Sequence, residues 1–161
     1  MDRFETLFGD LIACGEWGVD PDVPEVLLSE FEGAATTYTM HLFPGDSKEF
    51  LLFSCVAGDS IFIKENERIK ILELVNFINA QNAVLGSVGF IENKPGYLEF
   101  GIGYAWYLGD LAIPTEDVQR LAGVLVDNFE LLLHALRYVI ADNWTPYAAV
   151  EFVFSRPAQM T

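Results

Sequence analysis

Residues 84–108 have the sequence VLGSVGFIENKPGYLEFGIGYAWYL, and this pattern predicts a β-hairpin. Its arms are Val84–Glu92 and Tyr97–Leu108, and the residues between them include the proline and glycine typical of a turn. Along the second arm, bulky side chains alternate with other residues, so each kind falls on its own face of the strand. One face has Leu98, Phe100, Ile102, Tyr104, Trp106 and Leu108, and the other has Tyr97, Glu99, Gly101, Gly103, Ala105 and Tyr107. Because glycine and alanine leave the second face nearly bare, we expect it to permit close approach of another backbone or helix.

Three more strands are expected nearer the N-terminus. Two of them, Thr36–Phe43 and Glu49–Val56, are rich in β-branched or aromatic residues and are joined by turn residues at 44–47. The third segment, Val26–Glu32, is equally compatible with a helical turn. Before it, Asp20–Pro24 contains two prolines, which remove backbone donors, and we expect a loop there.

Helical periodicity is found at Asp2–Glu16, at Glu65–Gln81 and from Pro114 to about residue 142. In the last of these, Thr115 is a candidate N-cap. The short apolar tail after Pro146 is expected to pack back on the domain. The element order α-β-β-β-α-β-β-α predicts a single α+β domain over residues 1–161, with helices packed on an antiparallel β-sheet.

The predicted helices carry more apolar side chains than one-sided packing requires. In the segment 65–81, the main apolar face consists of Ile71, Leu72, Leu74, Val75 and Ile78. Ile69 and Phe77 lie outside that face, among polar residues. In the last helix, Val124, Leu131 and Tyr138 widen the apolar arc to roughly 220°, against about 100° for packing on one side. Such a surplus indicates that a second polypeptide covers part of the surface.

The chain is strongly acidic. It has 161 residues, of which 24 are Asp or Glu and 9 are Lys or Arg, for a formal net charge of −15. This charge repels phosphate backbones and anionic lipids, so neither nucleic acid nor a membrane is an expected partner. Its two simplest interpretations are solubility and attraction of a basic partner.

Composition also bears on the cellular setting. With 52% hydrophobic residues the chain can bury a sizeable core, yet no apolar run approaches the ~18 residues of a membrane span. The N-terminus lacks the pattern of a secretory signal. Cys14 and Cys55 are isolated in the sequence, without the spacing of zinc or redox motifs. We therefore expect a cytoplasmic protein with both thiols reduced.

The segment ILELVNFIN at 71–79, leading into GSVGF at 86–90, resembles the YbjN family of bacterial proteins. The resemblance covers residues 35–146 and includes Asn76 and Asn79 within an apolar helix and a long helix after Pro114-Thr115-Glu116. It implies the fold of type III secretion chaperones, which are small, acidic and usually dimeric and bind a segment of another protein without hydrolysing it. Proteins with other partners share this fold, so no secretion system is implied.

Few residues are suited to catalysis. His41 lies in a predicted strand and His134 on the polar side of the last helix, positions typical of surface or hydrogen-bonded histidines. Cys55 lies in an apolar strand, where a buried, inert thiol is the ordinary interpretation. We therefore expect no catalytic residue.

Cofactor and metal motifs are also incomplete. Gly101-Ile102-Gly103 lacks the third glycine and the following helix of a dinucleotide-binding motif. Asp20 with Asp22, or Asp46 with Glu49, could offer oxygens to calcium, but neither pair has the spacing of a calcium loop. We expect no cofactor and no metal.

The candidate interface residues are apolar groups outside the main core faces and amides able to contact a partner backbone. They are Ile69, Asn76, Phe77, Asn79, Tyr104, Trp106, Leu131 and Tyr138. An equally simple interpretation of the two asparagines is that they tie their helix to a neighbouring loop or to water.

These patterns favour a non-catalytic domain, chaperone-like or a regulatory adaptor, that forms a homodimer and binds a segment of a partner protein. The alternative is an enzyme or small-ligand sensor with a pocket over the face around Gly101, Gly103 and Ala105. A third possibility is a structural subunit of a larger assembly.

Overall fold

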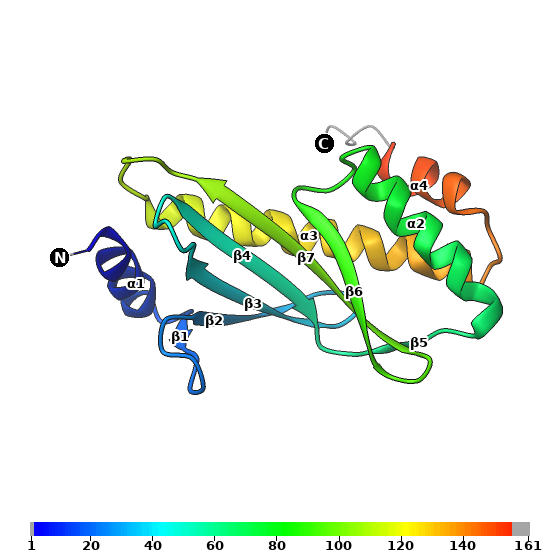
Figure 1. Cartoon of the computed structure of the whole chain (residues 1–161), viewed down its shortest axis with the longest axis horizontal. Coiled ribbons are helices and arrows are strands. Elements are labelled where there is room, and N and C mark those ends of the chain that lie inside the picture. Colours follow the sequence, from blue (N-terminus) through cyan, green and yellow to red (C-terminus); the bar gives the residue numbers. More distant parts are fainter. Residues whose placement is uncertain (1, 156–161) are drawn as a thin grey trace.

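An antiparallel β-sheet forms the centre of the protein in the computed structural model, which describes residues 2–155. Within that range the fold consists of this sheet, which has seven strands, and four α-helices (Figure 1). The strands are β1 (Gly18–Val19), β2 (Leu27–Glu32), β3 (Thr37–Pro44), β4 (Phe50–Ala57), β5 (Ile61–Phe62), β6 (Ser87–Lys94) and β7 (Tyr97–Tyr107). Their order across the sheet is β1-β2-β3-β4-β7, and both β5 and β6 pair with β7. The prediction of an α+β fold with an antiparallel sheet is confirmed.

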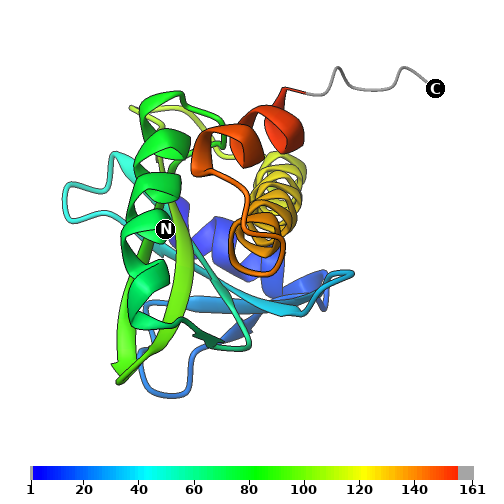
Figure 2. The same ribbon diagram turned by 90° about the vertical axis from the view of Figure 1, so that its right-hand side faces the viewer.

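The helices are α1 (Arg3–Ala13), α2 (Arg68–Ala80), α3 (Thr115–Ile140) and α4 (Pro146–Phe154), with a 3₁₀ turn at Glu65–Glu67 before α2. In Figure 1, α3 lies behind strands β3, β4 and β7, and no helix of the described chain lies in front of them. Figure 2 shows α4 between α2 and α3, and α4 contacts both neighbours. One face of the central strands is therefore left open. Among residues 2–155, no helix is both long enough and apolar enough to cross a bilayer.

Strand β4 illustrates the two faces of the sheet. Its residues Leu51, Phe53 and Cys55 are buried, whereas Leu52 and Ser54 between them stay partly exposed. We call the buried side, which faces α3, the inner face and the opposite side the outer face. The core between the inner face and α3 includes Met40, Leu42, Leu51, Phe53, Phe100, Ile102, Val118, Leu125, Phe129, Leu132 and Leu136. Burial of this apolar area is the main force that holds the helices on one side of the sheet.

Several predicted boundaries differ from the structure. The ambiguous segment at 26–32 is strand β2, not a helical turn. The first arm of the predicted hairpin begins at Ser87 and not at Val84, because Gly86 has a φ of +84° and the Leu85 N–H donates to the Asn128 side chain on α3 at 2.9 Å. The short strands β1 and β5 were not predicted, since two residues carry no alternation.

The start of α3 also differs from the prediction. Thr115 is the first helical residue and not the N-cap, and its hydroxyl caps no backbone group. Pro114 is the N-cap instead, and its carbonyl oxygen accepts the N–H groups of Asp117 and Val118 at 3.1 and 3.3 Å. Acidic residues do lie in the first turn, where the helix dipole favours them.

The apolar tail forms α4, which covers part of the apolar surplus of α3. Thr145 caps α4 by accepting a backbone hydrogen bond at 3.2 Å, and Pro146 occupies the first turn. Tyr138 on α3 stacks on Trp144 with ring centroids 4.6 Å apart, and Phe152 packs edge-on against both rings. At Tyr138, therefore, the chain's own C-terminal helix supplies cover that the sequence pattern assigned to a second polypeptide.

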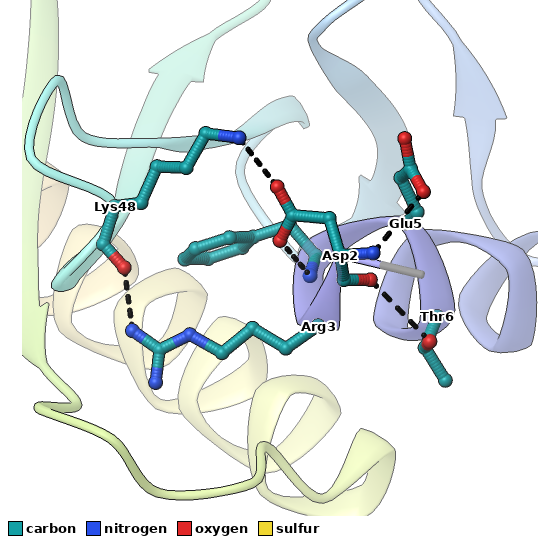
Figure 3. Close-up of polar contacts among 6 residues, drawn as sticks. Asp2, Arg3, Glu5, Thr6 and Lys48 are labelled. Atoms are coloured by element: carbon teal, nitrogen blue, oxygen red, sulfur yellow. Dashed lines mark hydrogen bonds and ion pairs between the residues drawn. The ribbon is translucent and has the colours of Figure 1, made fainter.

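Polar contacts fix the N-terminal helix to two loops, and Figure 3 shows those to the loop that contains Lys48. Asp2 caps α1 through its carboxylate, and its own N–H donates to Glu5 at 3.2 Å, which completes a capping box. The Asp2 carboxylate also forms an ion pair with Lys48, whose ammonium group holds the pKa of that carboxyl below its usual range. The Arg3 guanidinium donates to the carbonyl oxygens of Lys48 and Leu111. α1 is thereby joined to the β3–β4 turn and to the loop before α3.

Candidate functional site

The outer face of the sheet is hollowed by three adjoining depressions, which we call the outer groove. Their volumes are about 460, 440 and 300 Å³, and Ser54 on β4 lines all three. The largest runs between β4, β7 and β6, and the smallest reaches the loop between β1 and β2. The residues whose side chains or Cα atoms line the groove on the outer face are Asp20, Val23, Val26, His41, Phe43, Leu52, Ser54, Val56, Ser87, Gly89, Ile91, Glu99, Gly101, Gly103 and Ala105.

Glycine keeps the floor of the outer groove low. Gly89 and Gly101 are register partners across β6 and β7, and Gly103 lies opposite Ser87 on one side and Ser54 on the other. Neither Gly89 nor Gly103 has a positive φ, and a Cβ on either would meet no neighbouring atom closer than 3.9 Å. The backbone would therefore accept larger side chains here. What glycine contributes at these two positions is open space above the strands.

Gly86, just before β6, has the opposite role. Its φ is +84°, and a Cβ there would lie 2.1 Å from the Gly103 carbonyl oxygen. This close approach depends on the missing side chain of Gly86 itself and not on the bare face of β7, and it lets the chain enter β6 alongside β7. Glycine at position 86 is therefore required by the fold, whereas glycine at position 103 is not.

The walls of the outer groove are apolar. Phe43 on β3, Leu52 and Val56 on β4 and Ile91 on β6 all belong to it. Ile91 is 61% exposed, a high value for an aliphatic residue in a strand. Because apolar surface in contact with water is unfavourable, covering these side chains with a ligand would release free energy.

Carboxylates line two different hollows of the groove. Asp20 lies near the β1–β2 loop, and its Oδ1 accepts the N–H groups of Asp22 and Val23 at 2.8 and 3.3 Å. Glu99 lines the hollow beside β6 and accepts a hydrogen bond from the side-chain amide of Asn93. No lysine or arginine lines the groove within the described part of the chain. With a net charge of −15 on the whole chain, we expect the potential over this face to be negative.

The three residues weighed for catalysis do not converge. His41 lines the smallest hollow of the outer groove, next to Phe43. Cys55 belongs to the inner face, and burial raises the pKa of its thiol to about 12, so it stays protonated. His134 is on α3, beside a separate hollow of about 180 Å³. Residues 2–155 contain no group of three side chains placed to hold a metal ion.

Of the predicted interface residues on α2, three point outward and one does not. Ile69 is 69% exposed, Asn76 is exposed, and Phe77 is 36% exposed with its ring against Tyr147 of α4 at a centroid distance of 6.1 Å. Asn79 instead binds both backbone groups of Val88 on β6: its amide nitrogen donates to the carbonyl oxygen at 2.9 Å, and its oxygen accepts the N–H at 2.8 Å. Asn79 therefore ties α2 to the neighbouring strand β6, which is the second of the two interpretations of the asparagines.

The other four predicted interface residues lie elsewhere. Tyr104 and Trp106 are on the inner face of β7 and are half-buried against the core. Leu131, which is 38% exposed, and the half-buried Tyr138 are on α3 beside α4. The eight residues are thus divided among α2, β7 and α3.

Sequence reasoning identified the small residues on β7 but not the other walls of the outer groove. Ser54 on β4 and Ser87, Gly89 and Ile91 on β6 complete it, and only the pairing of both strands with β7 brings them together. Comparison of the chain with protein-family models, with curated proteins and with solved structures finds no match.

Proposed function

We propose that this protein is a non-catalytic binding domain that holds a segment of another polypeptide in the outer groove. The observation that supports this most is the open outer face: apolar walls and a glycine floor lie on the side of the sheet that the protein's own helices leave uncovered. A contiguous apolar depression of this size in a soluble domain is typical of a binding surface.

The order of the elements supports a chaperone-like fold for this domain. When the two short strands and α4 are set aside, the chain follows the order α-β-β-β-α-β-β-α. This is the arrangement that the resemblance to the YbjN family implies, and proteins of that fold bind polypeptide segments. Fold alone does not fix a partner, so the groove carries the functional argument.

We also propose that the domain forms a homodimer through the outward side of α2. Ile69 and Leu72 are exposed there, and Phe77 lies at its edge beside Tyr147. Covering these side chains would add apolar burial at an interface separate from the outer groove. Sedimentation at micromolar concentration should show a dimer, and Ile69→Glu should yield a monomer, while a monomeric wild type would refute this part of the proposal.

A peptide library tests the binding function directly. Displayed peptides would be selected on the wild-type protein and on Gly89→Val/Gly103→Val, which fills the groove without changing charge. We expect peptides enriched on the wild type to lose binding to the filled variant. Failure to enrich any peptide, or enrichment that is equal on both proteins, would refute a polypeptide site in the outer groove.

The rival function is a small-ligand sensor or enzyme over the Gly101 and Gly103 face. Its support is the volume of the largest hollow, about 460 Å³, which is within the range of small-molecule sites. Only a few polar side chains, Ser54, Ser87 and Glu99, line that hollow. A thermal-shift screen with small metabolites would favour the rival if a compound stabilised the wild type but not Gly103→Val.

A further inference from the structure

We infer that the polypeptide held in the outer groove is a cationic, amphipathic α-helix of another protein. This inference rests on the proposed function and adds the conformation and the charge of the partner. Three features of the groove support it: the hydrogen-bonding state of its strands, the charges that line it and the shape of its floor.

Hydrogen bonding favours a helix over an extended segment. The groove floor lies on β4, β7 and β6; β4 and β7 are each paired on both sides, and β6 is paired with β7. Their N–H and C=O groups are directed along the sheet to neighbouring strands and offer nothing to a chain lying on the outer face. An extended peptide placed there would leave its own backbone groups unsatisfied against apolar walls, which is costly. A helix satisfies its backbone internally and presents only side chains.

Charge complementarity indicates that the bound helix is positively charged. Asp20 and Glu99 line different hollows, and the described lining residues include no lysine or arginine to offset them. Lysines or arginines flanking the apolar face of a helix would meet these carboxylates while its apolar side chains cover Leu52 and Ile91. A second copy of this chain is disfavoured on this face, because it would bring another charge of −15 to the same negative surface.

The shape of the floor accommodates a helix at close range. Gly89, Gly101 and Gly103 are adjacent across β6 and β7, and Ser54 lies beside Gly103. Small residues on one surface let an opposing backbone approach closely, so that apolar side chains of the helix can reach the walls on either side. Val at position 103 would remove this space, since its Cβ fits the backbone and its methyl groups would project into the groove.

The test uses three fluorescent peptides and the intact protein. The first is an amphipathic peptide of Leu, Ala and Lys of about 18 residues, long enough to be helical. The second has Glu in place of every Lys, and the third has the composition of the first in an order without an apolar face. Fluorescence anisotropy is measured with the wild type, with Gly103→Val and with Gly9→Ala, a control on α1 where a Cβ meets no atom within 4 Å.

We expect the first peptide to bind the wild type and Gly9→Ala equally and Gly103→Val at least about tenfold more weakly, a loss of about 1.4 kcal/mol. Because Gly103→Val keeps the charge of the protein, non-specific attraction would be the same on both proteins. Asp20→Asn/Glu99→Gln should weaken binding several-fold, whereas the charge-matched control Asp10→Asn/Asp127→Asn, on the exposed sides of α1 and α3, should not.

Other outcomes overturn the inference. Equal binding of the first peptide to the wild type and Gly103→Val would place the helix elsewhere, and preference for the Glu peptide or the scrambled peptide would refute a cationic amphipathic helix. If the peptide library enriches extended or acidic sequences that Gly89→Val/Gly103→Val loses, the proposed function stands and this inference fails. If the library enriches nothing, both fail.

Discussion

Tyr38 on β3 donates its phenol hydrogen to the Glu130 carboxylate on α3 at 2.5 Å, across the layer that joins sheet and helix. Tyr38 is fully buried and its ring packs on Phe129 with centroids 5.0 Å apart. The Ala35 N–H reaches the same carboxylate oxygen at 3.5 Å. Through Glu130, α3 is therefore fastened to both β3 and the β2–β3 turn.

Removing this hydroxyl should lower stability. Tyr38→Phe leaves the half-buried Glu130 carboxylate without its shortest partner, and we expect a loss of about 1–3 kcal/mol in the free energy of unfolding. Glu130→Gln keeps an acceptor for the phenol and should cost less. Urea unfolding followed by circular dichroism measures the free energy of unfolding of both variants. Equal stability of Tyr38→Phe and wild type would contradict a stabilising role for the Tyr38–Glu130 hydrogen bond.

The same hydrogen bond predicts a loss of stability in alkali. Burial, followed by the hydrogen bond to Glu130, raises the pKa of Tyr38 above its ordinary value. A group whose pKa is higher in the folded state contributes its full stability below the pKa of the unfolded state, about 10 for a phenol, and loses it as the pH rises beyond that. Stability should therefore fall above about pH 10. In Tyr38→Phe this alkaline fall should be shallower, which unfolding curves at pH 9 to 11, about the phenol pKa, would measure.

Gly33 should tolerate no side chain. A Cβ there would lie 1.8 Å from Oε1 of Glu130 and 2.5 Å from the Tyr38 ring, so Gly33→Ala must displace both side chains or shift the turn. We expect a loss of about 1–3 kcal/mol, as for other overpacked sites. Gly9→Ala in α1 is the matched control, because it meets nothing within 4 Å and should stabilise the helix by about 0.5–1 kcal/mol. If Gly33→Ala were as stable as the wild type, the β2–β3 turn would have accommodated the methyl group, and the prediction would be wrong.

Asn76 and Asn79, neighbours on α2, should respond differently to alanine. Asn79→Ala leaves the N–H and the carbonyl oxygen of Val88 without their partner, at a cost of about 1–3 kcal/mol if water does not replace it. Asn76 is exposed, and Asn76→Ala should be neutral or slightly stabilising because alanine is the better helix former. Thermal unfolding of the two variants side by side gives the comparison. Similar melting temperatures would contradict a structural role for Asn79.

The two cysteines should differ in reactivity. Cys14 is exposed after α1, whereas Cys55 is buried on the inner face with a pKa of about 12. Since the thiolate is the reactive form, a chromogenic disulfide reagent at neutral pH should modify Cys14 alone in the native protein and both thiols in denaturant. Cys14→Ser should abolish the native reaction. Rapid reaction of Cys55 in the native protein would mean that the core opens readily.

Much of the fold could be predicted because the elements carry strong local patterns. The strict alternation of β7 and the β-branched and aromatic residues of β3 and β4 place those strands within about two residues of their observed ends. The helix α4 was missed because its nine residues are apolar on several sides, although Thr145-Pro146 is a regular helix start. Phe152 of α4 also covers Tyr138, and the sequence pattern of α3 alone could not indicate this contact.

The candidate site was only half predictable, for a physical reason. The bare face of β7 is a local property and indicates Gly101 and Gly103 directly. The pairing of β6 with β7 follows from the predicted hairpin, but the pairing of β4 with β7 joins segments far apart in the sequence, and local patterns do not specify it. The orientation of Asn79 depends in the same way on the position of β6 beside α2.

Amide chemical-shift mapping gives the most direct test of the outer groove as the binding surface. Isotope-labelled protein would be titrated with the tightest peptide from the library selection, and the perturbed amides located on the structure. We predict that the largest shifts fall on Ser54, Gly89, Gly101 and Gly103. Shifts confined to α2 and α4, with these four amides unchanged, would contradict the outer groove as the binding surface.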